Sequence, residues 1–492
     1  MNRLRLALLI FAAFIISIDF NIVYVALPDI GHELGFTAQS LQWVVSAYAV
    51  GFGGLLLLGG RAVDRLGARR VFVFGLAVFG LASLAGGLAG APGVLVAARV
   101  VQGTGGALLF PATLALINNT FAAGPARDRA LSLWGVAGSL GAVAGPMAGG
   151  VITNFLGWEW VFFVNAPLTL AAGVAALRLL DRDTTGGAWR GFDLPGALVA
   201  TAGSTLVVFG LASGPDAGWG SVRGAGALAV GGLLLGAFVL IERASRDPLA
   251  PPRLFGVRSL VTMMALIFVL MGTINTLHYL FYMDVQEVLG YSALGAGLAF
   301  LPMSVMSIVG AAKLLPVLLN RLGMRGALFT GVLGAGLSMA AVAAGMSAGG
   351  SYWRLLPGIV FLGLFAGMVY PMVFLASGAD VAAGEQGVAS ALVSTSQQIG
   401  GAVGLAALVA VANAGLDVDA GAAPAADLVA GLRTAGLVAA VVTVAGAFLV
   451  LRLKRPERRG TLRGEEAERR GTGAERPEPR PAAAELSVGP LP

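Results

Sequence analysis

The chain alternates long runs of apolar residues with short turns that hold most of its charges. A helix rises 1.5 Å per residue, so about 20 apolar residues cross the roughly 30 Å of hydrocarbon in a bilayer. Fourteen runs are close to this length, and we expect each to form a transmembrane helix. The runs are Leu6–Pro28, Leu41–Gly59, Val71–Gly90, Gly93–Ile117, Ala130–Val151, Trp160–Leu177, Leu194–Ala212, Gly224–Ile241, Leu260–Met283, Leu294–Leu315, Ala327–Met346, Leu355–Ala376, Gly387–Val411 and Thr434–Leu451.

Two local patterns occur twice. The turn that reads Asp-Arg-Leu-Gly-Ala-Arg from Asp64 returns in weaker form from Asn320 as Asn-Arg-Leu-Gly-Met-Arg. The glycine and proline that bound 103–111 return with the same spacing at 363–371. The chain therefore has two related halves, runs 1 to 6 and runs 9 to 14, with runs 7 and 8 inserted. The expected domains are two six-helix bundles at 1–180 and 259–454, an insertion at 181–258 and a tail at 455–492.

The composition is typical of a membrane protein. Hydrophobic residues make up 57% of the chain and charged residues 12%, whereas soluble domains have about 45–50% apolar and about 25% charged residues. The 73 glycines favour close contact between helices in a bilayer. We therefore expect an all-α polytopic membrane protein that lies in a lipid bilayer.

Several kinds of chemistry are disfavoured. The chain has no cysteine, which excludes disulfides, thiol catalysis and thiolate metal sites, and its two histidines, His32 and His278, argue against a histidine-rich metal centre. The chain also lacks the glycine-rich lysine loop of ATP-driven proteins and a nucleophile elbow. We expect no enzyme activity, no cofactor and no metal, and we expect energy to come from an ion gradient.

The arginine distribution predicts the orientation, because Lys and Arg collect in cytoplasmic loops. If the N-terminus is inside, the outer turns hold only Arg223, Arg354 and Arg433. Both termini are therefore expected in the cytoplasm, and the chain in the plasma or inner membrane. The arginines expected inside are Arg3, Arg5, Arg61, Arg65, Arg69, Arg70, Arg127, Arg129, Arg178, Arg182, Arg190, Arg243, Arg246, Arg253, Arg258, Arg321 and Arg325.

The two ends of the chain have other possible readings. After about Arg455 the apolar runs stop, and a sequence rich in Arg, Glu, Pro, Ala and Gly predicts a disordered tail. Its mixed charge favours a solvated end over an arm that binds nucleic acid. The first run follows two arginines like a signal peptide, but its length, Asp19 and the lack of a small-residue cleavage site favour a membrane helix.

Five motifs resemble those of one protein family. The first, a turn between the second and third runs, resembles the loop signature of the major facilitator superfamily and comprises Gly60, Asp64, Arg65, Gly67, Arg69 and Arg70. The others resemble motifs of its fourteen-span drug:proton antiporters. They are Asp19–Val23 with Ala26-Leu27-Pro28, Arg99 with Gln102–Gly106, Gly141 with Gly145-Pro146 and Gly149-Gly150, and Trp158 and Trp160 with Phe162–Pro167. Phe192-Asp193 with Gly196 is a further mark at the start of the inserted pair.

The resemblance covers about residues 6–452. It implies the major facilitator fold of two six-helix bundles plus two inserted spans. The two bundles would rock about a cavity at the membrane midplane. It also implies a proton-coupled exporter of bulky hydrophobic or cationic drugs, antibiotics or related small molecules, and we expect a monomer. Two alternatives are a proton-coupled importer of a metabolite, which the antiporter motif disfavours, and a nontransporting membrane scaffold or sensor.

Asp19 and Arg99 are the expected proton-coupling residues. An intramembrane carboxyl is costly, which makes Asp19 a functional candidate. Counted along their helices, the two charges lie at similar depths. Burial favours a protonated carboxyl and a nearby arginine favours an ionised one, so a change in their separation would drive proton uptake and release. The alternative is a fixed structural ion pair.

The charged turn is the expected cytoplasmic gate. The resemblance implies that Asp64 contacts the start of the run from Gly387 and holds the inner side closed while the carrier is open outward. Asn320 in the second copy would form a weaker contact, and Ala68 stands where the family often has a basic residue. The alternative is a positive-inside topology signal without a gating role.

The fifth run carries the antiporter motif. Gly141, Gly145 and Gly149 lie at four-residue spacing, hence on one helical face, and Pro146 favours a kink. We expect this face to pack against a helix of the other half and to seal the inner side against proton leak. Generic glycine packing is the alternative.

Polar residues inside other runs are candidates for the substrate cavity, because such side chains should face a partner or a cavity. His278 is either a packing residue or a proton relay. Asp284 is either an extra acid in the outer vestibule or a loop charge. The cavity candidates are Asn21, Gln102, Asn275, His278, Gln397 and Gln398.

Overall fold

The structure is a computed structural model that describes residues 2–37, 39–121, 124–183, 194–245, 252–381, 385–414 and 425–453. Met1–Leu453 group as one compact unit, and the described part of the chain is helical without a β-strand. The expected tail at 455–492 lies outside the described residues. The prediction of an all-α chain is confirmed.

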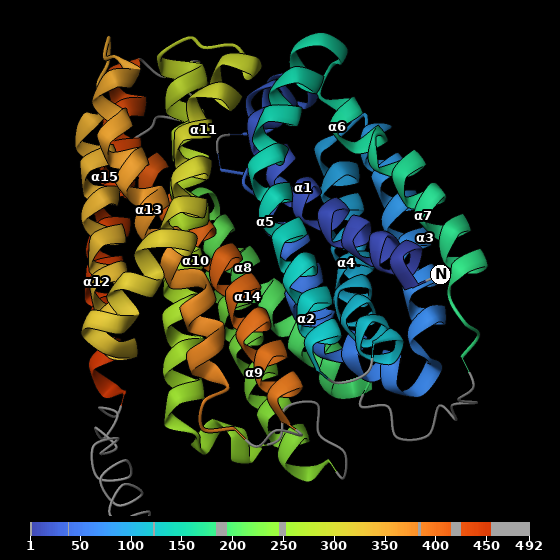
Figure 1. The fold of residues 1–492 in the computed structure, drawn as a ribbon. Coiled ribbons are helices and arrows are strands. Elements are labelled where there is room, and N and C mark those ends of the chain that lie inside the picture. Colours follow the sequence, from blue (N-terminus) through green and yellow to red (C-terminus); the bar gives the residue numbers. More distant parts are fainter. Residues whose placement is uncertain are drawn as a thin grey trace, which may run out of the picture. The chain divides into compact units, whose positions relative to one another are not determined.

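The helices follow the order of the apolar runs (Figure 1). The first half contains α1 (Asn2–Leu34), α2 (Trp43–Leu66), α3 (Ala68–Gly87), α4 (Pro92–Thr120), α5 (Pro125–Leu156), α6 (Glu159–Phe163) and α7 (Asn165–Leu179). The insertion contains α8 (Leu194–Ala217), the π-helical turn η1 (Val222–Gly226) and α9 (Ala227–Ala244). The second half contains η2 (Pro252–Gly256), α10 (Arg258–Met283), η3 (Asp284–Val288), α11 (Ala293–Val309), η4 (Gly310–Leu314), α12 (Leu315–Gly345), α13 (Tyr352–Ser377), α14 (Gln386–Asn413), α15 (Ala425–Ala447) and η6 (Phe448–Arg452).

Each predicted run overlaps one to three of these helices. Within the described ranges, 11 helical stretches are long and apolar enough to cross a bilayer. One of them, Ala293–Gly345, contains both the tenth and the eleventh run, and its backbone turns at Gly323 with a φ of 68°. Trp43–Leu56 and Leu198–Leu211 are shorter apolar segments. The multi-pass membrane fold is confirmed, and the exact number of fourteen spans stays a prediction.

The two halves repeat the same helix pairs. In the first half α1 packs on α5, α2 and α3 pack on α4, and α3 packs on α7. In the second half α10 packs on α14, α11 and α12 pack on α13, and α12 packs on α15. Each of these pairs is the counterpart of a first-half pair under the sequence repeat. The internal repeat read from two short motifs therefore extends to helix packing.

Four helix pairs join the halves: α1 with α10, α1 with α11, α2 with α14, and α5 with α11. The last two pairs are exchanged by the repeat, so the seam is built symmetrically. The inserted α8 packs against α2 and α14, and α9 packs against α8. The insertion therefore lies along one edge of the seam.

Three polar contacts between described residues cross the seam at one end. We call the end where α1 begins the proximal end and the end where α1 finishes the distal end. At the distal end the Nε2 atom of Gln286 donates to the carbonyl oxygen of Val25 at 3.0 Å. His32 Nε2 lies 3.0 Å from a carboxylate oxygen of Glu287. These contacts hold the distal part of the seam closed.

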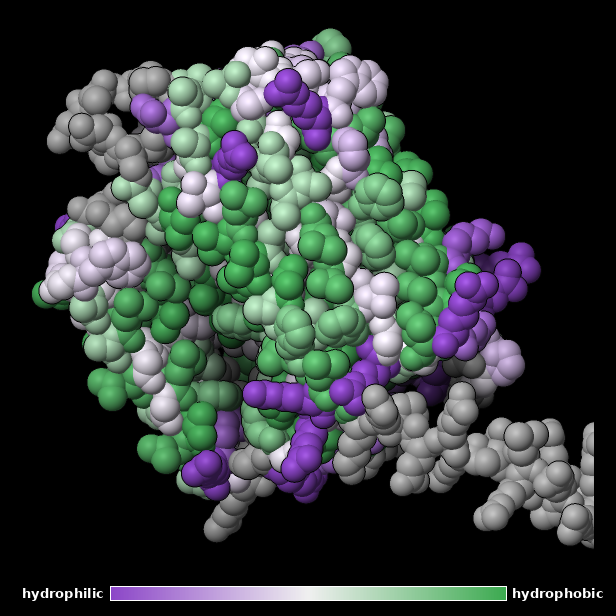
Figure 2. Space-filling model, turned by 90° about the vertical axis from the view of Figure 1, so that its left-hand side faces the viewer, coloured by the Kyte–Doolittle hydropathy of each residue, from purple (hydrophilic) through white to green (hydrophobic). Residues whose placement is uncertain are grey.

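The surface of the unit suits a lipid environment. On the side that Figure 2 shows, hydrophobic residues cover the middle of the surface and hydrophilic residues gather toward its edges. Large apolar side chains of α12 and α15, such as Leu337 and Val441, are exposed. Continuous exposed apolar surface of this kind marks contact with a membrane or a partner.

Candidate functional site

A buried polar cluster surrounds Asp19 inside the first half. Asp19 lies on α1 and Arg99 on α4, and the Nη1 atom of Arg99 donates to Oδ2 of Asp19 at 3.0 Å. The exposed fraction of the side chain is 0% for Asp19 and 1% for Arg99. The two charges that the sequence placed at similar depths therefore meet in the structure.

Arg99 has further partners on two helices. Its Nε atom donates to the carbonyl oxygen of Val44 on α2 at 2.8 Å, and its Nη1 atom also donates to Oε1 of Gln102 at 2.6 Å. The guanidinium lies 4.4 Å from the ring centroid of Tyr48. A buried charge is tolerated only with such pairing. Arg99 thus ties α1, α2 and α4 together at one point.

The second carboxylate oxygen of Asp19 accepts two neutral donors. Nδ2 of Asn165 donates to Oδ1 at 2.6 Å, and Nε2 of Gln102 donates to it at 2.8 Å. Gln102 also contacts the hydroxyl of Ser83 on α3 at 2.6 Å. Asn165 is the first residue of α7, where the sixth run is interrupted at Val164. The cluster therefore joins α1, α3, α4 and α7.

The structure gives Gln102 and Asn165 a different role from the one predicted from the sequence. Gln102 was a candidate for the substrate cavity, but in the structure it is buried in contact with Asp19. Asn165 was noted only as part of a motif. The sequence signal that could have identified Asn165 is an amide side chain between apolar residues of a predicted span, because such a side chain needs a polar partner. Because Asp19 has no exposed surface, proton exchange with water requires part of this cluster to separate.

The charged turn between α2 and α3 is anchored by a residue of the segment that follows α7. The backbone N–H groups of Arg69 and Arg70 donate to the two carboxylate oxygens of Asp183 at 3.1 and 3.0 Å. An anion at a helix N-terminus is favourable, so Asp183 caps α3. Gly67 has a φ of +96°, and a Cβ atom there would lie 2.2 Å from Cγ of Asp183. Both the conformation and the close carboxylate require glycine at this position.

The other residues of the predicted gate lie in the last two turns of α2. Asp64 lies near the end of α2, and its side chain falls outside the described residues, so its contact with the start of α14 stays a prediction. A Cβ atom at Gly60 would meet no atom within 4 Å. Arg65 lies in the last turn of α2. Phe192 and Asp193 of the inserted pair also lie outside the described residues.

The glycines of the antiporter motif have a different partner from the one predicted. A Cβ atom at Gly141, Gly145 or Gly149 would lie 2.6 to 2.8 Å from atoms of α1, which belongs to the same half. Gly150 alone of the four turns toward the other half, where a Cβ atom would lie 2.8 Å from the carbonyl oxygen of Ala293 on α11. The predicted packing against the other half is therefore wrong for the first three glycines, because their shared face is covered by α1.

The polar cavity candidates lie at separate places. Asn21 donates from Nδ2 to the carbonyl oxygen of Ser17 on its own helix at 2.8 Å. Asn275 is buried at the α10–α14 contact, where its Nδ2 atom would lie 2.5 Å from a Cβ atom at Gly401. Gln398 faces Gly53 across the α2–α14 seam. The structure thus places these three amides at helix contacts.

Gln397 is more accessible. Its Oε1 atom accepts from the hydroxyl of Tyr370 on α13 at 3.3 Å, and Tyr370 is 43% exposed. Tyr370 is not predicted from the sequence, because a tyrosine in an apolar run gives no signal of its own. Asp284 is buried at the start of η3, and its Oδ1 atom has no hydrogen-bond partner.

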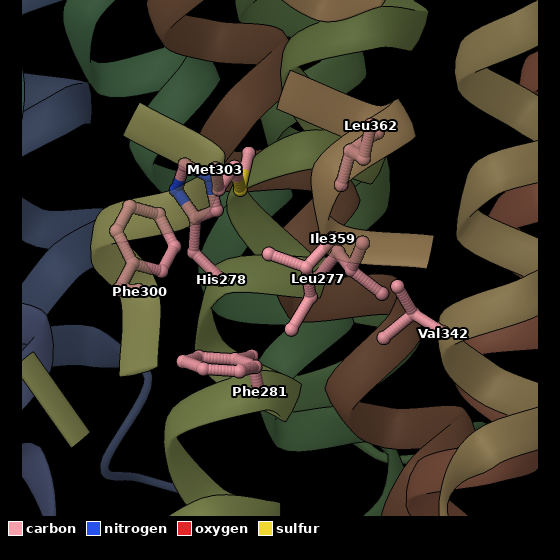
Figure 3. Close-up of a pocket in the computed structure, with 8 residues that line it drawn as sticks. All are labelled: Leu277, His278, Phe281, Phe300, Met303, Val342, Ile359 and Leu362. Carbon is pink, nitrogen blue, oxygen red and sulfur yellow. The ribbon is translucent and has the colours of Figure 1, made fainter. Parts of the chain in front are cut away.

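His278 lies beside a small pocket within the second half. Figure 3 shows its ring close to Phe300 and Met303. Apart from His278, the residues that line this pocket are apolar. The lining residues are Leu277, His278, Phe281, Phe300, Met303, Val342, Ile359 and Leu362, from α10, α11, α12 and α13. Among the described residues, no group of three or more His, Cys, Asp or Glu side chains is placed to hold a metal ion.

The chain is similar to known membrane transporters. The family model described as Major Facilitator Superfamily matches residues 9–405. The cephamycin export protein CmcT of Amycolatopsis lactamdurans is 39% identical over 82% of this chain and 84% of its own length. The puromycin resistance protein pur8 of Streptomyces alboniger is 39% identical over 86% and 84%, respectively. The lincomycin resistance protein of Streptomyces lincolnensis is 35% identical over 83% and 85%.

Solved structures show the same fold at low sequence identity. A POT family peptide transporter in an auto-inhibited form has a TM-score of 0.69 and 15% identity, and the match covers 92% of this chain and 98% of that chain. The human organic anion transporter MFSD10 has a TM-score of 0.62 and 15% identity, with 91% and 99% covered. These structures support the arrangement of helices and carry no information on the substrate.

Proposed function

This chain belongs to the major facilitator superfamily, so it is a multi-pass membrane transporter and not an enzyme, and we propose that it exports antibiotics or related drug-like molecules. The buried contact between Asp19 and Arg99 carries the proposal, because intramembrane ion pairs mark transport and proton pathways. The substrate class follows from relatives that are 39% identical and are named for cephamycin export and puromycin resistance.

We further propose that export is coupled to protons at Asp19. In the outward-facing state Arg99 and Asp19 separate, an external proton binds the carboxylate, and the substrate leaves. Loss of the proton toward the cytoplasm restores the ion pair and resets the carrier. The close packing of Asn165 and Gln102 on Asp19 supports this cycle, since all three side chains must rearrange for the proton to enter.

The orientation of the proposal follows from the arginine distribution. The proximal end faces the cytoplasm, both termini lie there, and the membrane is the plasma or inner membrane. The closed distal seam then supports a state that is shut toward the outside. The two halves, 1–180 and 259–454, rock about the seam, the insertion at 181–258 stays at its edge, and the carrier works as a monomer.

Two groups of residues complete the proposal. Asp64 contacts the start of α14 in the outward-facing state, and Gly150 contributes to the seal on the α5–α11 side. The substrate contacts amides of α1, α10 and α14 together with Tyr370, which lies half-exposed beside Gln397. The proposed amides are Asn21, Asn275, Gln397 and Gln398.

The substrate class is tested by drug accumulation in a bacterial host that lacks its own exporters. Cells that produce the chain should accumulate less labelled puromycin, lincomycin or cephamycin than cells with an empty vector. Cells that produce equal amounts of the Asp19→Asn protein should accumulate as much as the control. Equal accumulation in all three strains for every compound would contradict the proposal for this substrate class.

A further inference from the structure

Three residues that each carry a buried polar atom without a partner cluster where α1 faces α10. The hydroxyls of Tyr24 and Tyr282 and the Nε2 atom of His278 are buried, and none has a hydrogen-bond partner among the described residues. Tyr24 and Tyr282 are each only 1% exposed. Most buried polar groups are hydrogen-bonded, so a group of three that is not points to a second arrangement in which they are satisfied.

The rings of these residues form one cluster that spans the two halves. The ring centroid of His278 lies 5.7 Å from that of Tyr24 and 5.0 Å from that of Phe300, and the interplanar angles are 89° and 85°. Tyr282 stacks on Tyr24 at 6.4 Å and on Phe300 at 5.5 Å. Tyr24 comes from α1, whereas the other three residues come from α10 and α11. A separation of α1 from α10 would therefore open the cluster.

The groups that face His278 offer it no counter-charge. α1 contributes Tyr24, and α10 itself contributes Tyr282; these phenols are the titratable groups of the cluster. The other residues of the pocket that His278 lines are apolar (Figure 3). A buried imidazolium without a carboxylate partner is costly. The closed cluster consequently excludes the charged form of His278.

We propose that His278 is a proton-binding site of a distal gate, which consists of the ring cluster of Tyr24, His278, Tyr282 and Phe300. When α1 moves away, His278 takes up a proton from the water on the distal side of the membrane. It returns to the neutral form as the cluster closes. The proton goes back to the same water, so the site adds none to the number carried per cycle. Acid on the distal side therefore favours the open gate. The inference rests on the proposed alternating access and gives that motion a second point of proton control.

The cluster is also connected to the Asp19 site. Tyr24 and Asp19 lie on the same helix. The ring centroid of Phe20 lies 6.2 Å from that of Tyr24 and 5.9 Å from that of Tyr48. Tyr48 in turn lies under the guanidinium of Arg99. A movement of α1 that exposes His278 therefore also disturbs the surroundings of Asp19.

Nuclear magnetic resonance can test this inference directly, because the chain has two histidines and no cysteine. His32→Gln removes the other imidazole, which contacts Glu287 at the distal seam. In this background, ¹⁵N-histidine signals report the protonation of His278 alone in lipid nanodiscs. Spin labels on cysteines at Gln39 and Asn413, whose side chains lie 3.3 Å apart across the distal seam, report its opening.

We expect the imidazolium signal and the longer distal distance to appear together as the pH is lowered, and His278→Gln to remove the acid-driven opening. Tyr24→Phe, which keeps the ring, should leave the coupled transition in place. An unchanged acid-driven opening in His278→Gln, or protonation of His278 without opening, would overturn the inference. Drug-dependent proton transport measured on the same proteins separates this failure from failure of the proposed function.

Discussion

Individual side chains hold Asp19 in a site that it shares with four helices. Its two oxygens accept from Arg99, Gln102 and Asn165, and the distances are 2.6 to 3.0 Å. Each partner therefore restrains both the position of the carboxylate and the moment at which water can reach it. Arg99 was foreseen from its charge, whereas the two amides gain their importance from the fold.

At this scale we predict a strong effect of Asn165→Ala. The substitution removes a hydrogen bond to a carboxylate, which is worth about 1.5–3 kcal/mol, and it should lower thermal stability in detergent and slow transport. Thr169→Val is the matched control one turn along α7, because the Thr169 hydroxyl donates only to backbone carbonyls of its own helix. Similar stability and transport rates for the two variants would show that Asn165 does not restrain Asp19.

The limits of sequence reasoning are clear at the residue scale. Asp19 and Arg99 could be paired because depth along a helix is a simple count of residues. Asp183 could not be assigned to the N-terminus of α3, since it lies in a loop 114 residues further along the chain than Arg69. Periodicity carries no information on such contacts.

At the scale of elements, the turn between α2 and α3 depends on one of its two glycines. Gly67→Ala forces a side chain into a φ of +96° and against Asp183; the conformation alone costs about 1–2 kcal/mol. Gly60 lies inside α2 with free space around it, so Gly60→Ala should raise helix stability by up to about 1 kcal/mol. Thermal unfolding of the two variants should thus shift in opposite directions. A lower unfolding temperature for Gly60→Ala than for Gly67→Ala would be evidence against this account.

The contact between α5 and α1 gives a second prediction for an element. A Cβ atom at Gly145 would lie 2.8 Å from Cβ of Asn21, so Gly145→Ala must push α1 away from α5 and should reduce transport several-fold. Gly138→Ala meets no atom within 4 Å and serves as the control. Transport rates at equal protein levels are the measurement, and full activity of Gly145→Ala would remove this contact from the mechanism.

The glycines of α5 show which property of an element can be predicted from its sequence. The spacing of Gly141, Gly145 and Gly149 correctly places them on one face, because a helix has 3.6 residues per turn. The spacing does not say which helix covers that face, and α1 of the same half does so instead of a helix of the other half. Packing partners are a property of the whole fold, and a single run does not contain them.

At the scale of the whole molecule, the repeated helix pairs create two comparable halves that meet along a seam. At its distal end Gln286, His32 and Gln39 each contribute one polar contact between the halves. Such contacts are easily exchanged for water. A seam of this kind suits halves that separate and close again.

A cross-link across the distal seam should stop transport. The natural chain has no cysteine, so His32→Cys and Glu287→Cys, which replace side chains that touch at 3.0 Å, would be the only thiols. A short bifunctional thiol reagent should abolish transport by the double variant, and a cleavable version should restore it on reduction. The two single variants control for labelling alone, and continued transport by the cross-linked protein would contradict opening at this end.

The account as a whole depends on proton movement through Asp19. The most direct measurement follows the pH inside inverted membrane vesicles, acidified by respiration and containing the wild-type chain, Asp19→Asn or the control Asp29→Asn from the same helix. Addition of a transported drug should release protons from vesicles with the wild-type and control proteins and leave vesicles with Asp19→Asn unchanged. Drug-dependent proton release in the Asp19→Asn vesicles would contradict the assignment of Asp19 as the coupling site.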